Sequence, residues 1–250
     1  DKHCTYCVIP KVRGSFRSFP IEYLVNQTKK LVEGGVKEII LVAQETTLYG
    51  VDLYGKKSLP KLLHNLGLIE GLEWIRILYC YPEEINDELI EAIKNEPKVC
   101  HYLDMPIQHA SDNILKRMGR RTSKQELTDI VAKLRREIPD IALRTTLITG
   151  FPGETDVDHE EVMQFIDECE FDRLGVFTYS REEDTVAAQM PDQIDEEIKE
   201  KYRDELMQLQ QEISADRSAA MIGRIVRVMI EGFIPEDNTY VGRSYKDAPN

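Results

Sequence analysis

Short apolar runs alternate with segments of helical periodicity along most of this 250-residue sequence. The apolar runs predict strands over residues 38–43, 74–79, 102–105, 141–149 and 173–179. The periodic segments predict helices over residues 21–33, 59–66, 87–94, 124–137 and about 155–169. Strands that alternate with helices indicate βαβ units and a parallel sheet. Right-handed crossovers place the helices outside when such a sheet curls, so we predict an α/β fold, a partial TIM-like (βα) barrel of parallel strands.

The pattern changes near residue 220. A long charged helix is predicted over 194–220, residues 222–230 then alternate apolar and polar side chains, and 240–243 reads as a second strand. We therefore predict a barrel domain over 1–220 and the start of a small all-β domain over 221–250, which is too short to bury a core alone. Because the chain starts at Asp1 without Met, we expect a fragment whose barrel lacks its first strand.

Charge and cysteine content limit the possible partners and compartment. The formal net charge is −13, whereas proteins that bind nucleic-acid backbones present a basic face, so a basic protein partner fits better. The local basic segment Lys116, Arg117, Arg120 and Arg121 is interpreted as a solvated helix end. Five sparse cysteines argue against a disulfide framework and for a reducing, cytoplasmic setting. The sequence has no apolar run of about eighteen residues, so we expect no membrane span.

Cys4 and Cys7 lie three residues apart at the start of the chain. Two thiolates at that spacing can share a soft metal or an iron–sulfur cluster, but they can also form half of a zinc site or a redox pair. The pair alone leaves these alternatives open. The remaining cysteines lie among apolar residues, and we predict that they are small core residues: Cys80, Cys100 and Cys169.

Polar stretches follow the predicted strands at 44–47, 79–82, 108–111, 150–154 and 180–184. In (βα) barrels the loops after the carboxyl ends of the strands build the active site. The cysteine pair would lie in the loop after the missing first strand. The sequence therefore predicts one site at one mouth of the barrel. Two helix starts are also predicted there, with Ser111 as a cap and with Thr155 and Asp158 as a capping box.

Cys4-Thr-Tyr-Cys7 followed by Val-Ile-Pro resembles the end of the C-x3-C-x2-C loop of radical S-adenosylmethionine (SAM) enzymes, whose first cysteine would directly precede Asp1. Five further segments resemble the methylthiotransferase branch of that family: LVAQETTLYG (41–50), RILYCYP (76–82), YLDMPIQHAS (102–111), RTTLITGFPGET (144–155) and FTYSREEDT (177–185). They look most like the group that modifies an aspartate of small-subunit ribosomal protein S-twelve. GRSYKDAP (242–249) resembles that group's TRAM β domain. Asp184 stands where the group commonly has glycine.

This resemblance implies a radical SAM core with a 4Fe-4S cluster held by Cys4, Cys7 and a third cysteine. The iron without a thiolate would bind the amino and carboxylate groups of SAM, and an electron from the cluster would cleave SAM to a 5′-deoxyadenosyl radical. The resemblance also implies an electron donor protein and an N-terminal methylthiotransferase domain with a second cluster, which this chain lacks. We therefore expect the fragment alone to be inactive.

The resemblance further assigns residues to SAM itself. Tyr6 would lie near the adenine, and Gln44 would hold the methionine end. Arg144 could pair with the methionine carboxylate, although a salt bridge inside the barrel explains an arginine there equally well.

The remaining SAM contacts are expected in two later loops. Gly150 and Gly153 would let the backbone approach the adenine, but a tight turn before a helix also explains both glycines. Gln108 and Ser111 could reach the ribose. No catalytic residue beyond the cluster ligands is predicted.

The function implied by the resemblance is methylthiolation of an aspartate β-carbon in a small-subunit ribosomal protein, and the acidic charge suits such a basic substrate. The alternative within the branch is methylthiolation of a tRNA adenosine, for which a basic rim would be expected. An alternative of another class is a zinc-binding, non-enzymatic module that associates with the ribosome.

Overall fold

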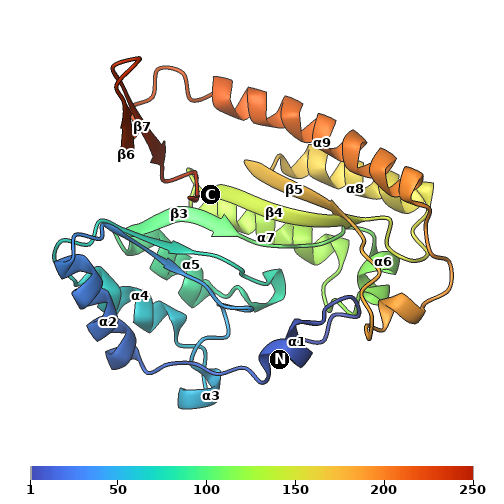
Figure 1. Cartoon of the computed structure of the whole chain (residues 1–250), viewed down its shortest axis with the longest axis horizontal. Helices are drawn as coiled ribbons and strands as arrows, with labels where there is room; N and C mark the ends of the chain where they lie inside the picture. The colour runs from blue at the N-terminus through green and yellow to red at the C-terminus, as the bar shows by residue number, and fades with distance from the viewer. Residues whose placement is uncertain (1, 250) are drawn as a thin grey trace.

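The computed structural model describes residues 2–249. Its centre is a five-stranded parallel sheet whose strands lie side by side in chain order (Figure 1). The strands are β1 (Glu38–Leu41), β2 (Trp74–Ile77), β3 (Val99–Asp104), β4 (Ala142–Thr149) and β5 (Arg173–Thr178). All four pairings are parallel. The predicted α/β class and the parallel sheet are confirmed.

Helices connect consecutive strands of the parallel sheet, as the βα alternation predicted. They are α4 (Leu59–Gly67), α5 (Asp87–Asn95), α6 (Asp112–Arg117), α7 (Lys124–Glu137) and α8 (Asp156–Cys169). The helix α2 (Ile21–Glu33) precedes β1, and α9 (Glu196–Ala219) follows β5. Short helical turns that the periodicity did not predict are α1 (Ile9–Arg13), α3 (Val51–Tyr54), η1 (Pro82–Glu84) and η2 (Ala187–Gln189). The predicted capping box at α8 is present, with Asp158 in the place of the usual glutamate.

Alternation along β4 separates two faces of the sheet. Leu143 and Leu147 are buried in the main apolar core beneath the helices, whereas Arg144, Thr146 and Ile148 alternate with them and are only half-buried. Side chains two apart on a strand share a face, so these three residues line the opposite face. The helix α9 packs along β5 beside it (Figure 1).

At the amino end of the sheet, the opposite face is filled by a charged layer. The guanidinium of Arg76 is fully buried and lies over the ring of Tyr102, 4.6 Å from its centroid. Its Nε donates to Oε1 of Glu38 at 2.8 Å, and its Nη1 donates to the carbonyl oxygen of Tyr245 at 2.6 Å. Glu38 also accepts a hydrogen bond from Arg243. The Glu38 carboxylate therefore binds two arginines, and the C-terminal segment packs over them.

The C-terminal segment contains the hairpin of β6 (Val228–Ile234) and β7 (Thr239–Ser244), which are antiparallel. The second predicted strand, over 240–243, is confirmed within β7, whereas the first begins only at Val228, so that residues 222–227 of the predicted alternating segment lie outside it. The assignment of this hairpin to a TRAM domain stays a prediction.

The three cysteines predicted for the core, Cys80, Cys100 and Cys169, are buried. All five cysteines carry free thiols. Within residues 2–249, no helix is both long and apolar enough to cross a bilayer. The interpretation of Arg120 as part of a solvated helix end is wrong, because only 6% of this residue is exposed.

Candidate functional site

Cys4 and Cys7 lie on one tight turn, closed by a hydrogen bond from the backbone N–H of Cys7 to the carbonyl of Cys4 at 3.1 Å. Cys4 is buried and Cys7 is half-buried. Between them, Thr5 is bound from both sides. Its N–H donates to the carbonyl of Met118 at 2.9 Å, and its own carbonyl accepts the N–H of Ala187 at 2.9 Å. These bonds attach the cysteine turn to the end of α6 and to the segment that follows β5.

Two further contacts place the turn at the carboxyl end of the sheet. The ring of Tyr6 meets Phe151, in the loop after β4, edge to face at 6.3 Å between centroids. The ammonium of Lys2 bonds Glu83 at 3.2 Å and Glu84 at 2.6 Å, both in η1 after β2. The cysteines therefore lie where the polar loops after the strands meet, as the sequence predicted for a single mouth.

The surroundings of Cys4 fit a thiolate-ligated metal group. A cavity of about 200 Å³ is lined by Cys4, Tyr81 and Arg120. Cys4 Sγ lies 3.7 Å from the Tyr81 hydroxyl. Burial raises the pKa of the Cys7 thiol and so disfavours its thiolate without a metal, so that metal binding here would have to displace a proton. The turn offers two soft sulfur donors, Cys4 and Cys7. In the part of the chain that the structure describes, no group of three His, Cys, Asp or Glu side chains converges to complete a metal site.

In the loop after β1, Gln44 is exposed and the next residue, Glu45, is buried. Contact of Gln44 with the methionine end of SAM stays a prediction. Oε1 of Glu45 accepts hydrogen bonds from the Thr47 N–H at 3.0 Å and from the Thr47 hydroxyl. Its Oε2 is buried without a hydrogen-bond partner among the described residues. Burial raises the pKa of Glu45 to about 7. The polar run after the strand was the available signal, but it did not show which of its residues is buried.

Because the folded chain binds the Glu45 proton more tightly than the unfolded chain, its free energy of unfolding should fall as pH rises from about 4.5 to about 7. We expect Glu45→Gln to remove this fall, so that the variant gains roughly 2 kcal/mol on the parent between pH 5 and pH 8. Urea unfolding at both pH values measures the difference. Glu70→Gln, at an exposed position, is the control and should show no gain. A Glu45→Gln curve parallel to that of the parent would contradict the assignment.

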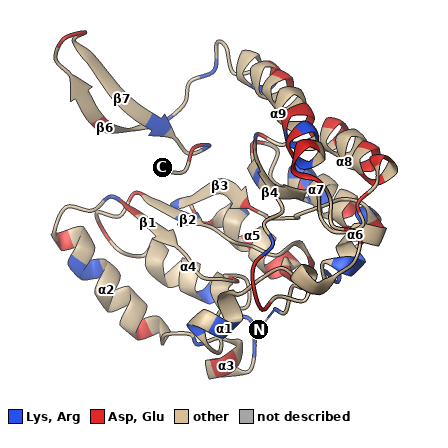
Figure 2. Cartoon of the chain, turned by 45° about the vertical axis from the view of Figure 1, so that its right-hand side comes forward, with Lys and Arg blue, Asp and Glu red and all other residues tan. Residues whose placement is uncertain are grey.

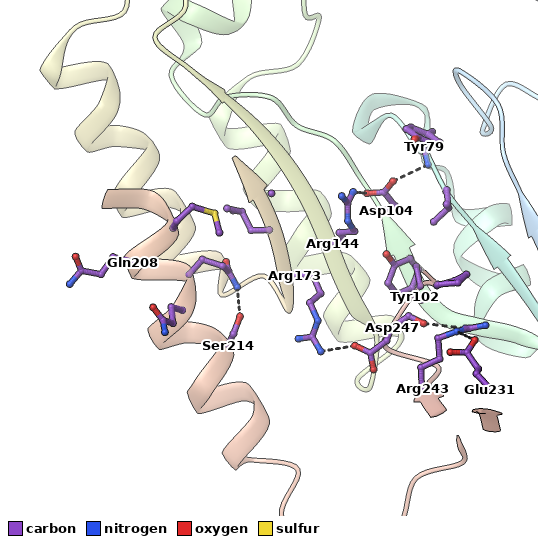
Figure 3. A pocket seen from close by; sticks show the side chains of 18 of the residues that line it. Tyr79, Tyr102, Asp104, Arg144, Arg173, Gln208, Ser214, Glu231, Arg243 and Asp247 are labelled. Atoms are coloured by element: carbon purple, nitrogen blue, oxygen red, sulfur yellow. Dashed lines mark hydrogen bonds and ion pairs between the residues drawn. The ribbon is translucent and has the colours of Figure 1, made fainter. Parts of the chain in front are cut away.

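Arg144 lies in a different and larger cavity of about 1340 Å³, between the sheet, α9 and the C-terminal segment (Figure 3). Its Nη1 donates to Oδ1 of the buried Asp104 at 2.6 Å and to the Thr146 hydroxyl at 3.3 Å. The salt bridge inside the barrel, one of the two predicted explanations, is therefore present. Since 35% of the Arg144 side chain stays exposed, its contact with the methionine carboxylate stays a prediction.

The two glycines of the loop after β4 have positive φ, +69° at Gly150 and +82° at Gly153. A Cβ at Gly150 would lie 2.0 Å from Cγ of Lys199 in α9, and one at Gly153 would lie 2.5 Å from Cζ of Arg117. Close packing of the chain on itself thus accounts for both residues. Contact of this loop with the adenine stays a prediction.

The loop after β3 makes polar contacts with α8 and with the loop after β4. Ser111 does not cap α6 with its side chain as predicted, because its hydroxyl donates to Asp158 at 2.5 Å. The Ser111 N–H donates to Nδ1 of His109 at 3.0 Å, and Nε2 of His109 lies 3.3 Å from Oε1 of the buried Glu154. Glu154 in turn accepts the N–H of Phe151 at 2.9 Å. These contacts bring the loops after β3 and β4 together, although His109 Nε2 and Glu154 Oε1 have no hydrogen-bond partner among the described residues.

Gln108 has a positive φ of 73° and forms a parallel bridge with Leu147 at the end of β4. Its side-chain Oε1 is buried and has no hydrogen-bond partner within residues 2–249. An unpartnered buried oxygen in a site loop is compatible with a bound hydroxyl or amine donor. Ribose contacts by Gln108 and Ser111 stay predictions.

Comparison with known proteins agrees with this geometry. A family model described as the radical SAM superfamily matches residues 1–166. The chain is 64% identical over all 250 residues to the ribosomal protein uS12 methylthiotransferase RimO of Lachnoclostridium phytofermentans, covering 57% of that protein. It is 54% identical over 249 residues to the protein of the same name from Clostridium botulinum, covering 56% of it. The chain thus spans little more than half the length of the curated relatives it matches.

Solved structures show the same fold at low sequence identity. Methylornithine synthase superposes with a TM-score of 0.60 at 12% identity, covering 86% of this chain and 59% of that one. Coproporphyrinogen III oxidase from Escherichia coli, titled a radical SAM enzyme, superposes with a TM-score of 0.56 at 17% identity, covering 85% of this chain and 50% of that one. Because the region matched by the family model holds the cysteine turn and the first four strands of the sheet, the chain belongs to the radical SAM superfamily.

Proposed function

We propose that this chain is the core of an enzyme that methylthiolates the β-carbon of an aspartate in ribosomal protein uS12. The observation that carries the proposal is the cysteine turn at the carboxyl end of a parallel sheet, in a chain 52–64% identical over its length to proteins named uS12 methylthiotransferases. Membership of the radical SAM superfamily implies a 4Fe-4S cluster and SAM. A second cluster and an electron donor protein belong to the proposal for the whole enzyme.

In this proposal Cys4 and Cys7 supply two of the cluster's thiolates. When bound, the cluster and SAM supply the radical chemistry that activates an otherwise inert C–H bond. The protein's part is to hold and orient the reacting groups. Tyr6, whose ring packs edge to face on Phe151, forms one side of the site next to the cysteines. The Ser111–His109 hydrogen bond and the approach of His109 to Glu154 bring the adjoining loops together.

The charge of the molecule supports a basic substrate. Acidic residues are frequent on α8 and outnumber the basic residues on α9 (Figure 2), and α9 lines the larger cavity. A surface of one sign raises the association rate of an oppositely charged partner, and ribosomal proteins are commonly basic because they bind RNA.

The proposal is tested in a strain from which the gene carrying this sequence has been deleted. We expect uS12 from that strain to lack the mass of one methylthio group on an aspartate, and complementation with the complete reading frame to restore it. Complementation with Cys4→Ser should not restore it. Nucleosides from the tRNA of the same cells provide the second readout. A methylthioadenosine that disappears while uS12 is unchanged would overturn the proposal in favour of a tRNA substrate.

A further inference from the structure

Arg120 is a buried arginine beside the cysteine turn. Only 6% of it is exposed, and its guanidinium lies 4.2 Å from the centroid of the Tyr81 ring. Its Nη2 donates to the carbonyl oxygen of Pro106 at 2.9 Å. Arginine seldom occupies a buried position without several partners, because each of its N–H groups loses water on burial. The single bond to Pro106 does not account for its position.

Two nitrogens of this guanidinium, Nε and Nη1, are buried without a hydrogen-bond partner in the described part of the chain. Buried polar groups that lack partners are rare and point to an unrecorded ligand or to a functional role. Arg120 and Cys4 line the same small cavity. The hydroxyl of Tyr81, whose ring carries the guanidinium, lies 3.7 Å from Cys4 Sγ. Hydrogen-bond acceptors for these two nitrogens would therefore have to lie in the cavity that Cys4 also lines.

The backbone that carries Arg120 is joined to the backbone that carries the cysteines. The Thr5 hydroxyl donates to the carbonyl of Arg117 at 2.9 Å, and the Thr5 N–H donates to the carbonyl of Met118. Gly119 completes this contact with a φ of +74°, and a Cβ there would lie 3.3 Å from the carbonyl oxygen of His3. These contacts place the turn after α6 against the cysteine turn, and they place Arg120 in the cavity that Cys4 also lines.

We infer that Arg120, supported by Tyr81, is a positioning residue that donates hydrogen bonds and a positive charge to the sulfur atoms of the cluster held at Cys4. The inference rests on the proposed cluster site and goes beyond it, because it names a group outside the ligands that sets the cluster's electronic properties. Iron–sulfur clusters acquire their reduction potentials from net charge, hydrogen bonds to sulfur and solvent exposure, and groups around the ligands commonly tune metal sites. A cluster with cysteine ligands carries negative charge that grows on reduction, and a fixed buried cation stabilises the reduced form more than the oxidised form.

Removal of the Arg120 charge should therefore lower the reduction potential. The test uses the complete polypeptide encoded by the gene that carries this sequence, reconstituted anaerobically with iron and sulfide. EPR-monitored redox titration without SAM reports the cluster alone, and its signal is the one absent from the Cys4→Ser variant. Arg120→Met removes charge and hydrogen bonds. Arg120→Gln removes the charge and keeps a side-chain amide donor at this position, and circular dichroism checks that each variant is folded. Both should titrate at a more negative potential than the parent.

Arg76→Met is the matched control, because Arg76 is also a buried arginine with an unpartnered nitrogen but lies in the charged layer at the other end of the sheet. It should lose stability and keep the parental potential. Loss of iron from folded Arg120 variants, with iron retained in Arg76→Met, would also support the inference. If the parent holds the cluster and Arg120→Gln retains full iron and titrates at the parental potential, this inference alone is overturned. A parent that retains no iron overturns the proposed cluster site and the inference with it.

Discussion

Replacement of both Cys4 and Cys7 by serine should remove the iron of one 4Fe-4S cluster from the reconstituted complete polypeptide. A serine hydroxyl does not replace a thiolate as a soft ligand, and the two sulfurs share one turn, closed by the Cys7 N–H bond to the Cys4 carbonyl. Formation of methylthiolated uS12 should fall below detection, because radical generation depends on that cluster. Iron and sulfide analysis after anaerobic gel filtration measures the loss, and mass spectrometry of uS12 measures the activity.

The chain provides its own controls for this experiment. Cys100 and Cys169 are buried among apolar residues, and burial raises the pKa of each thiol to about 11, which disfavours the thiolate. Cys100→Ala and Cys169→Ala should keep the parental iron content, at some cost in stability. Full iron in the double serine variant would show that the cluster lies elsewhere. Tight stoichiometric zinc in the parent would favour the zinc-binding alternative.

The second large effect is expected at Glu38. Its carboxylate accepts hydrogen bonds from Arg76 and Arg243, and the side chains of all three residues are largely buried. Glu38→Gln leaves the fully buried Arg76 without a counter-charge, and it leaves Arg243 with only the exposed Glu231. Breaking a buried ion pair by removal of one partner typically costs about 3–5 kcal/mol, a large part of the roughly 5–15 kcal/mol by which domains are stable. We expect a loss of about that size in the free energy of unfolding, measured by urea titration.

Glu33→Gln, at an exposed position near the end of α2, is the matched control and should stay within about 0.5 kcal/mol of the parent. Because Glu38 opens β1 at the amino end of the sheet, the Glu38→Gln variant should keep its iron when assayed below its unfolding temperature. A loss smaller than about 1 kcal/mol would mean that the charged layer contributes little net stability.

The sequence predicted the sheet well because each strand and helix carries a local signal. The apolar runs and the helical spacing gave all five parallel strands and the long helices, and the Thr155–Asp158 pair gave the start of α8. Such signals need only neighbours in the chain. The short turns α1 and α3 escaped prediction because four or five residues are too few to show a period.

The site was predicted less completely, because its chemistry depends on contacts between segments far apart in the chain. Ser111 was expected to cap α6, but its hydroxyl donates a hydrogen bond to Asp158, which lies 47 residues further along the chain. Arg120 belongs to a run of basic residues that is typical of a helix end in water, and nothing local shows that Tyr81 and Pro106 bury it. Glu45 is the same kind of case, since its burial depends on how the loop after β1 packs on the end of β2.

The attachment of Thr5 has a consequence for how iron reaches the site. Its two backbone bonds, to Met118 and Ala187, join loop and helix-end segments and contribute nothing to the pairing of the parallel strands. Such irregular segments can open and reclose through sub-global fluctuations that cost far less than complete unfolding. The cysteines can thus become accessible to an iron donor while the barrel scaffold stays intact, so that metallation follows folding instead of having to accompany it.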